Sequence, residues 1–258
     1  MKKKSKIIKN AIIFILLIIL TFYIILKDQN IGEMFQILGI VKLQYILIAV
    51  LCMCIYVLGE SINIGRTLKA LNEKTTFFQN IKYALIGFFF SGITPAASGG
   101  QPMQIYYMYK DKISVANSTL SLLINLSSMQ VVTISLALIS VVVNHNIMNT
   151  ALICFFVIGI LLNASALTLL IIAIFHKKLL QKLINFVVKI MKKIKIKNVD
   201  KKQEKIENEL NKYQASSDYI KEHKLVMLKT IFTTYIQFLA YYSVSYWVYR
   251  SFGLNEYN

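Results

Sequence analysis

Long apolar runs alternate with short polar links along this chain of 258 residues. Each run is close to, or longer than, the roughly 20 residues that an α-helix needs to cross a bilayer. We predict membrane spans over residues 7–26, 43–62, 115–143, 147–175 and 225–249. The composition agrees, because 56% of the residues are hydrophobic and the mean hydropathy is +0.57. We therefore expect an all-α integral membrane protein, in which residues 1–258 form a single membrane domain with about five transmembrane helices.

One further apolar region is interrupted by the segment Ser91–Pro102. This segment contains the chain's only two prolines, Pro95 and Pro102. Proline removes a backbone donor and clashes with the preceding turn, so no continuous helix runs through the segment. Hydrocarbon cannot satisfy the freed backbone groups, so irregular backbone at membrane depth needs cover from protein or a polar cavity. The break is therefore a candidate transport or binding site, and a structural kink that packs small residues closely is the alternative.

The apolar stretches on either side of this break are each too short to cross a bilayer alone. Basic residues flank the region at both ends, with Lys82 before it and Lys110 and Lys112 after it. We predict a re-entrant broken-helix hairpin over residues 83–109. It enters from the cytoplasmic side and places residues 95–102 near its tip.

The formal net charge is +17. Cytoplasmic links carry an excess of lysine and arginine, which predicts a multi-pass protein with a cytoplasmic amino terminus and a cytoplasmic link over residues 176–224. In a soluble domain this charge would favour nucleic-acid binding. Here the lysines cluster beside predicted spans. We therefore expect membrane phospholipids, including anionic lipid, as partners and no nucleic acid.

The long basic link has two parts. Between Leu179 and Lys197, apolar and basic side chains interleave at helical spacing, which predicts an amphipathic helix at the membrane surface. Anionic lipid attracts each lysine near the surface by about 1 kcal/mol. The candidate lipid-surface residues are Lys182, Lys189, Lys192 and Lys193. Residues 200–222 mix Glu and Lys, which predicts a solvated helical connector.

Polar side chains in the span 115–143 recur at spacings of three, four or seven residues, which places them on one helical face. They are Asn117, Ser121, Asn125, Ser128 and Ser135. Polar groups in a span need partners away from lipid, so this face should point into the protein. It would line a substrate path or hydrogen-bond to neighbouring helices, and the spacing leaves both roles open.

Two other spans contribute candidate residues. Gln237 and Tyr241 lie deep in the last span and are candidates for lining a cavity, whereas the tyrosines near Trp247 are expected at the membrane interface. Glu60 and Arg66 lie at the cytoplasmic end of the span 43–62. They are close enough along one face to be coupled, and we expect a snorkelling pair.

Signals of a soluble enzyme are scarce. The cysteines Cys52, Cys54 and Cys154 lie in predicted spans without zinc-site spacing, which is typical of packing residues. The sequence lacks a phosphate-cradling glycine loop, and no specific nucleophile–base or paired-carboxylate arrangement stands out. We expect no catalytic residue, no cofactor and no metal.

The segments Gly87–Pro95 and Ser98–Pro102, followed by a tyrosine-rich helix start, resemble the signature of the flippase-like membrane region of bacterial lysylphosphatidylglycerol synthases and their stand-alone relatives. Arg66 and the segment Arg250–Gly253 also resemble that family, and the similarity covers nearly the whole chain. The resemblance implies a bacterial cell-membrane protein that moves aminoacylated phosphatidylglycerol, or another lipid-linked cargo, between leaflets. Such transport contributes to envelope charge and to resistance against cationic antimicrobial peptides.

A translocated headgroup needs a polar path through hydrocarbon. At the break, Gly99 and Gly100 would let the backbone approach a lipid phosphate, and Thr94, Ser98 and Gln101 would add side-chain donors. The candidate substrate path comprises Thr94, Pro95, Ser98, Gly99, Gly100, Gln101, Pro102, Asn117, Ser121, Asn125, Ser128, Arg66, Gln237 and Tyr241.

The family resembled here usually continues with further spans and a second glycine-rich, glutamate-bearing break. We expect a longer chain or a carboxy-terminal partner to supply that part. In fused members, a cytosolic domain transfers lysine from lysyl-tRNA to phosphatidylglycerol, and this sequence lacks that domain. Three functions stay open. They are lipid translocation, the membrane part of a phosphatidylglycerol lysyltransferase whose catalysis lies in a separate domain, and a non-catalytic scaffold that recruits a partner.

Overall fold

The computed structural model describes residues 39–193 and 199–254, together with the isolated positions 23, 24, 27 and 32. The described residues are helical apart from turns and links and contain no strand, which confirms the all-α prediction. The predicted span 7–26 lies almost wholly outside the described residues. The chain divides into two compact units, residues 51–243 and residues 1–50 with 244–258.

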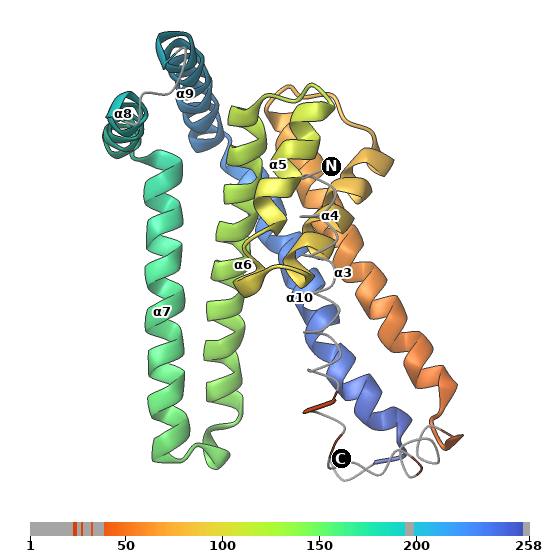
Figure 1. Cartoon of the computed structure of the whole chain (residues 1–258). Helices are drawn as coiled ribbons and strands as arrows, with labels where there is room; N and C mark the ends of the chain where they lie inside the picture. Colours follow the sequence, from red (N-terminus) through yellow and green to blue (C-terminus); the bar gives the residue numbers. More distant parts are fainter. Residues whose placement is uncertain (1–22, 25–26, 28–31, 33–38, 194–198, 255–258) are drawn as a thin grey trace. The chain divides into compact units, whose positions relative to one another are not determined.

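The elements that follow residue 42 alternate long helices with short links (Figure 1). They are α3 (Leu43–Ala70), α4 (Phe77–Gly92), η1 (Pro95–Ala97), α5 (Gly100–Lys110), α6 (Val115–Val143), η2 (His145–Ile147), α7 (Thr150–Phe175), α8 (Lys177–Lys193), α9 (Val199–Glu222) and α10 (Lys224–Ser251). Among the described residues, α3, α6 and α7 are the helices long and apolar enough to cross a membrane. Although α10 has 28 residues, its polar positions keep it outside that group, so its spanning role stays a prediction.

Side-chain caps determine where three helices begin. At the start of α4, the Thr76 hydroxyl accepts a hydrogen bond from Gln79 N at 3.2 Å, and the Gln79 side chain accepts one from Thr76 N at 2.8 Å. This reciprocal arrangement is a capping box. Ser114 caps α6 and Asn149 caps α7, each accepting from the amide three residues further on. Local sequence therefore supplies a cap at each of these helix starts, and at the start of α6 Glu73 and Glu209 accept further backbone hydrogen bonds.

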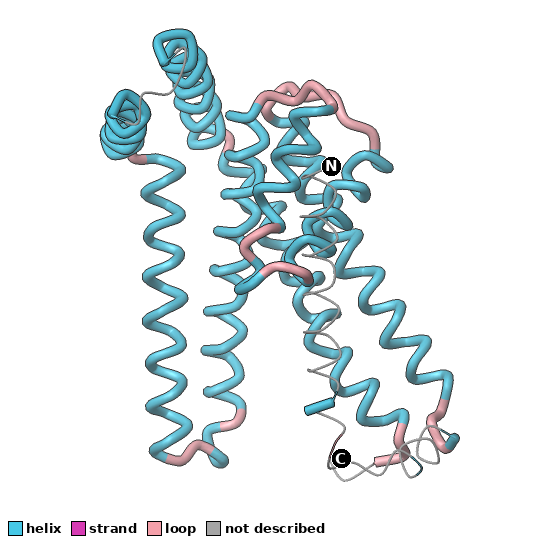
Figure 2. Tube along the Cα trace, viewed as in Figure 1, coloured by secondary structure: helices cyan, strands magenta, loops and turns pink. Residues whose placement is uncertain are grey.

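The predicted break is present, and α4 and α5 form a helical hairpin on either side of it (Figure 2). α4 ends at Gly92 and the helix resumes at Gly100. At the open end, the Asp111 carboxylate pairs with Lys82 and accepts a hydrogen bond from the Tyr83 hydroxyl at 2.6 Å. Hydrogen bonds from Lys82 and, to a smaller extent, from Tyr83 lower the pKa of Asp111. The two ends of the hairpin thus lie side by side, and its depth in a membrane stays a prediction.

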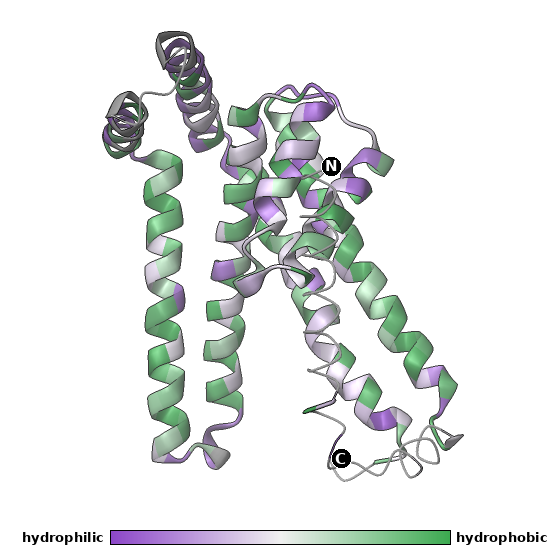
Figure 3. Cartoon of the chain, viewed as in Figure 1, coloured by the Kyte–Doolittle hydropathy of each residue, from purple (hydrophilic) through white to green (hydrophobic). Residues whose placement is uncertain are grey.

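Two apolar clusters hold residues 51–243 together. The first joins α3, α4, α5 and α6 around the fully buried side chains of Tyr83 and Met108. The second joins the end of α3, the start of α6 and the end of α7 to α9, around Leu120 and Ile220. The outward surfaces of α6 and α7 are strongly apolar (Figure 3), and most side chains of α7 are exposed. Many apolar residues of this fold are therefore exposed, as expected for a surface that lipid covers.

The predicted helix over residues 200–222 is present as α9, but the expectation that it is a solvated connector is wrong for one of its faces, which packs against α6 and α7. The Tyr213 hydroxyl donates to Ala173 O at 2.9 Å, and the Ser217 hydroxyl donates to Ile174 O. Burial raises the pKa of Tyr213. The charged residues of α9 occupy part of its surface only, and the buried face satisfies carbonyl groups that the last turn of α7 leaves open.

The smaller unit brings aromatic and basic side chains together. The ring of Tyr45 stacks on Trp247 with centroids 6.1 Å apart, and the Arg250 guanidinium lies 6.0 Å from the Tyr45 ring. Lys42 N donates to Ser251 O at 2.8 Å, which joins the start of α3 to the end of α10 within this unit. Amphipathic rings of this kind are typical of membrane interfaces, and the interfacial position of the tyrosines near Trp247 stays a prediction.

Candidate functional site

A buried carboxylate lies at the meeting of three helices within residues 51–243. Glu60 of α3 is 8% exposed, Asn125 of α6 is 1% exposed and Gln237 of α10 is fully buried. Asn125 Nδ2 donates to Glu60 Oε1 at 2.8 Å, and Gln237 Nε2 donates to Glu60 Oε2 at 3.4 Å. Two amide donors from different helices therefore hold one acid group, which is costly to bury when it carries charge.

The expected pair of Glu60 and Arg66 is wrong, because the two side chains bind different partners. Arg66 Nη1 donates to Asn63 Oδ1 and to Lys229 O, both at 2.8 Å, and its Nη2 donates to Thr233 Oγ1 at 2.8 Å. Arg66 therefore joins the last turns of α3 to the start of α10. Among the described residues, Glu60 forms no ion pair. The carboxylate is left with neutral protein partners.

Glycine at position 59 explains how α10 comes close enough to bind Glu60. A Cβ atom placed on Gly59 would lie 3.1 Å from Gln237 Cβ and 3.2 Å from its Cγ. These distances are shorter than ordinary van der Waals contacts. The missing side chain at position 59 therefore gives Gln237 the space from which its amide reaches the neighbouring carboxylate.

A small cavity of about 190 Å³ opens beside Glu60. Its lining comes from α3, the hairpin and the middle of α6, and comprises Tyr56, Glu60, Ala84, Gly87, Phe88, Ser91, Gln101, Gln104 and Met129. A Cβ atom on Gly87 would lie 2.5 Å from Gln104 Nε2, so the glycine lets this amide cross from α5 and donate to Tyr83 O at 3.1 Å. The cavity places polar groups of the broken helices beside the buried acid.

Most residues of the break contact one another. The Thr94 hydroxyl donates to Phe90 O at 2.6 Å and accepts from Gly99 N at 2.9 Å. A Cβ atom on Gly99 would lie 2.6 Å from Thr94 Cγ2, and one on Gly100 would lie 2.2 Å from Ser91 Oγ. Thr94, Gly99 and Gly100 therefore pack against α4 and against each other, which is the structural role expected if the break is a kink that packs small residues closely.

The remaining residues of the break differ in position. Gln101 lines the cavity. Pro102 lies in the first turn of α5, where its missing N–H has no helical partner to lose. Pro95 starts η1, and its carbonyl accepts a hydrogen bond from the exposed Ser98 at 2.9 Å. Gln101 is thus the candidate path residue of the break that lines the cavity at the acid, and Ser91, at the start of the break, lines it as well.

The polar face of α6 points inward, as predicted for Ser121, Asn125 and Ser128, which are at most 3% exposed. Asn125 binds Glu60, Ser121 contacts the Thr67 hydroxyl, and Ser128 donates to the carbonyl of Ile124 in its own helix. The face thus combines one site residue with others that pack helices.

Two predicted path residues lie away from the acid. Asn117 Nδ2 donates to Glu73 Oε1 at 2.8 Å, and its Oδ1 accepts from the Ser216 hydroxyl at 2.7 Å, so this side chain ties the start of α6 to its neighbours. Tyr241 is 45% exposed, and its ring lies 4.9 Å from the ring of Tyr56. Tyr241 therefore contacts a residue of the cavity lining, Tyr56, but does not line the cavity itself.

Sequence reasoning did not place Glu60 in the candidate path, and it missed Tyr56, Ser91, Gln104 and Met129 as cavity residues. Ser91 lies within the predicted break, and no short motif marks Tyr56, Gln104 or Met129. The available signal was Glu60 itself, an acidic residue within an apolar run. No group of three His, Cys, Asp or Glu side chains with metal-binding geometry occurs in the part of the chain that the structure describes.

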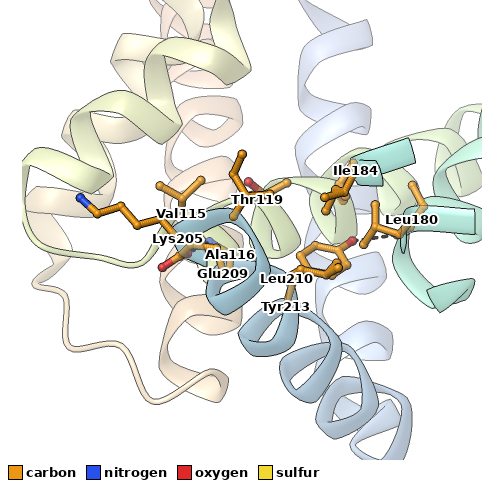
Figure 4. A pocket seen from close by; sticks show the side chains of 12 residues that line it. Val115, Ala116, Thr119, Leu180, Ile184, Lys205, Glu209, Leu210 and Tyr213 are labelled. Atoms are coloured by element: carbon orange, nitrogen blue, oxygen red, sulfur yellow. Dashed lines mark hydrogen bonds between the residues drawn. The ribbon is translucent and has the colours of Figure 1, made fainter. Parts of the chain in front are cut away.

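A second, apolar cavity of about 390 Å³ lies between the start of α6, α8 and α9 (Figure 4). Leu180 and Ile184 of α8 face Leu210 and Tyr213 of α9 across it. The predicted surface helix over residues 179–197 corresponds to α8, which is described over Lys177–Lys193. Lys182 and Lys189 are exposed on it. Lys192 and Lys193 belong to α8, but their side chains lie outside the description.

The helical fold and the membrane-length helices define a membrane protein, and the buried polar residues around Glu60 form a candidate site among its helices. In the comparison with family models, residues 7–256 match the family described as lysylphosphatidylglycerol synthase TM region, and the chain belongs to this family. No curated protein and no solved structure matches the chain.

Proposed function

We propose that this chain translocates a phospholipid with a cationic, aminoacylated headgroup, such as lysylphosphatidylglycerol, between membrane leaflets. One observation carries the proposal. A buried carboxylate, Glu60, is held by two amides beside a polar cavity, with no protein cation paired to it among the described residues. Family membership supports a lipid with a lysyl group.

An ammonium group fits the atoms around Glu60. It brings three donors and a positive charge, whereas the carboxylate brings acceptors and a negative charge. Two further acceptors, Asn125 Oδ1 and Gln237 Oε1, are buried without a hydrogen-bond partner in the described structure. Unmade hydrogen bonds of this kind are costly. A headgroup ammonium at this site would satisfy these oxygens and offset the cost of burying the acid.

The cavity supplies polar contacts on the route to the acid. Ser91, Gln101 and Gln104 come from the two halves of the broken helix, and Met129 marks the middle of α6 beside them. Discontinuous helices commonly form transport sites, because their polar groups are buried without facing lipid. A headgroup can exchange hydrogen bonds along these side chains while its acyl chains remain in the bilayer.

The test is lipid scrambling in proteoliposomes that contain labelled lysylphosphatidylglycerol or labelled phosphatidylglycerol. Glu60→Gln keeps the size of the side chain and removes its charge. We expect lysylphosphatidylglycerol transport to fall by about tenfold or more and phosphatidylglycerol transport to change less. Glu204→Gln, at an exposed position on α9, is the matched control and should transport like the parent chain.

Stability separates a functional acid from a structural one. Because Glu60 has no cationic partner among the residues that the structure describes, Glu60→Gln should raise the free energy of unfolding in detergent by about 1 kcal/mol. Loss of transport together with a gain in stability supports the proposal. Unchanged lysylphosphatidylglycerol transport would reject it, and loss of both transport and stability would assign Glu60 to packing.

We also propose that α8 lies on the membrane surface and binds anionic lipid, with Lys182, Lys189, Lys192 and Lys193 as contacts. Residues 177–193 include six lysines and no acidic residue. The cavity beside α8 would accommodate apolar groups below that surface. In the same liposomes, Lys182→Gln/Lys189→Gln should weaken the dependence of activity on anionic lipid content, and an unchanged dependence would contradict this role.

The other functions remain alternatives that the same experiment separates. If the parent chain does not move lipid, one of the other two functions becomes the better proposal. These are the membrane part of a lysyltransferase and a scaffold for a transferase or carboxy-terminal partner. A scaffold should depend on the lysines of α8, whereas a translocator should depend on Glu60.

A further inference from the structure

The acid group of Glu60 is too deeply buried to hold an unpaired charge. Its side chain belongs to a residue that is 8% exposed, and among the described residues it forms no ion pair. A bare carboxylate at such a position costs far more free energy than a hydrogen-bonded neutral acid. The proposed cargo supplies a cation only while it is bound. The empty site therefore needs either another cation or a proton.

The described elements around Glu60 present no group that could replace the missing cation. One further titratable side chain lines the cavity, that of Tyr56 on α3. Tyr241 of α10 lies against it, with ring centroids 4.9 Å apart, and the ring of Tyr242 lies 5.6 Å from that of Tyr241. A phenol is either neutral or negative, so it cannot act as the counter-ion. The residues that α4, α5 and α6 contribute to the lining carry apolar, hydroxyl or amide groups, and Arg66 forms its hydrogen bonds elsewhere.

The amide of Gln237 can bond to both forms of the acid. Its Nε2 donates to Glu60 Oε2 at 3.4 Å, the longer of the two bonds to the carboxylate, and its own Oε1 is buried without a partner in the described structure. Half a turn of the amide exchanges its donor and its acceptor, so that Oε1 would accept from a carboxylic O–H on Glu60. A Cβ atom on Gly59 would lie 3.3 Å from this Oε1, so glycine leaves room for the turn. Meanwhile Asn125 donates to the other oxygen of Glu60, which accepts in either form of the acid.

We propose that Glu60 exchanges a proton for the cationic group of the cargo, so that the chain works as a proton–lipid antiporter. This inference rests on the proposed function, in which the cargo carries an ammonium group. The empty site holds the neutral acid, bonded to the amides of Asn125 and Gln237, and the loaded site holds the carboxylate paired with the ammonium.

The exchange is a single proton transfer in each direction. When the ammonium enters, the O–H bond of the acid breaks, its electron pair stays on the carboxylate, and the proton passes to water. The ammonium keeps its own protons. When the cargo leaves, a proton from water restores the neutral acid. One proton is therefore exchanged for each lipid, and a proton gradient drives the lipid toward the leaflet that faces the more acidic solution.

Infrared spectroscopy tests the state of the empty site. In an ester-free detergent at about pH 6, ordinary carboxyl groups are ionised, so the carbonyl band of a carboxylic acid reports a buried neutral acid. The parent chain and Glu204→Gln should show this band, and it should move in heavy water. Glu60→Gln should lack it. Gln237→Met should shift it to higher frequency, because the acid loses a hydrogen-bond partner, which a merely structural role for Gln237 would not do.

Calorimetry counts the protons that leave when lipid binds. The detergent-purified chain is titrated with lysylphosphatidylglycerol at about pH 6 in two buffers of different ionisation enthalpy. At this pH the amino groups of the lysyl headgroup are already charged, so any released proton comes from the protein. The parent chain and Glu204→Gln should release about one proton per lipid bound. Phosphatidylglycerol, which has no ammonium group, should release none.

A gradient experiment tests the coupling. Proteoliposomes with labelled lysylphosphatidylglycerol receive solutions of about pH 5.5 and pH 6.5 on their two sides, and potassium with valinomycin holds the membrane potential at zero. For one-to-one exchange, this difference of about one pH unit supports an enrichment of up to about tenfold in the leaflet on the acidic side. A protonophore should abolish the enrichment. Protein-free liposomes and Glu60→Gln should show none.

The contrary results separate this inference from the proposed function. Transport that depends on Glu60 but gives an even lipid distribution and no proton release would overturn the exchange and keep the translocator. A parent chain without the acid band, or a band that persists in Glu60→Gln, would overturn the neutral acid at Glu60. If the parent chain moves no lipid, the proposed function fails and the antiport fails with it, whereas the band and the proton count still decide whether Glu60 exchanges a proton for the ammonium on binding.

Discussion

Helices α6 and α7 are adjacent, similar in length and both apolar enough to span a membrane, yet some polar residues of α6 bind a neighbouring helix and those of α7 bind carbonyls of α7 itself. α6 has ten buried residues, among them Ser121, Asn125 and Ser128. All 26 residues of α7 are described, and Ile174 is the one that is buried. Hydropathy thus identifies both helices as membrane segments, and it does not tell which of them builds the site.

The hydrogen bonds show the difference at the level of single side chains. In α7, the polar groups of Asn163, Ser165 and Thr168 donate to carbonyls of their own helix. In α6, Asn125 reaches α3 and Ser121 contacts Thr67 of α3. A polar residue that satisfies itself locally can face lipid, whereas one that needs a partner fixes a neighbouring helix. Whether a polar side chain bonds to its own helix or to a neighbouring helix therefore says more about helix packing than its residue type does.

The strongest test of this comparison replaces one asparagine in each helix. Asn125→Ala should reduce lysylphosphatidylglycerol transport by about tenfold or more and destabilise the fold by about 1–3 kcal/mol, because Glu60 loses its shorter hydrogen bond. Asn163→Ala should keep transport and change the free energy of unfolding by less than about 0.5 kcal/mol. Liposome scrambling and chemical unfolding in detergent measure both. Equal effects of the two variants would contradict the difference in role between Asn125 of α6 and Asn163 of α7.

Much of the scaffold around this site could be predicted from local sequence. The break at Pro95 and Pro102 follows from backbone chemistry, and the inward face of α6 follows from the spacing of its polar residues. The partners of Glu60 could not be predicted in this way. Asn125 and Gln237 lie 65 and 177 residues away in sequence, and they meet the acid only where three helices cross. The close approach at Gly59 that permits this meeting leaves no periodic signal.

The misassignment of Arg66 and of α9 has the same origin. Spacing along one helix brought Glu60 and Arg66 together, but Arg66 finds carbonyl and hydroxyl acceptors at the start of α10. The mixed charges of α9 resemble a solvated helix, but Tyr213 and Ser217 bind the open carbonyls at the end of α7. In both cases, hydrogen-bonding groups of another helix determined the partner, and a single sequence does not show where those groups lie.

A smaller effect should follow from steric changes on the same two helices. Ser121 is fully buried against Thr67, so Ser121→Leu should destabilise the protein by about 1–3 kcal/mol through overpacking between α6 and α3. Ser165 is exposed on α7, and Ser165→Leu should be neutral or slightly stabilising in detergent. Unfolding temperatures of the two variants provide the measurement. A stable Ser121→Leu variant would mean that the two helices can separate without loss.

The smallest predicted effect is one that α6 and α7 share. Ser114 and Asn149 cap these helices through the same local hydrogen bond, at 3.1 Å and 2.9 Å. Ser114→Ala and Asn149→Ala should each lower the free energy of unfolding by about 1 kcal/mol, measured by chemical unfolding in detergent. Both should leave lipid transport unchanged, since neither side chain contacts the acid site. A large difference between the two would show that packing around α6, including the hydrogen bond from Ser114 N to Glu73, extends to its first turn. Equal effects would show that capping depends on local sequence alone, so that the contrast between the two helices arises from their side-chain partners along the span and not from the way each helix begins.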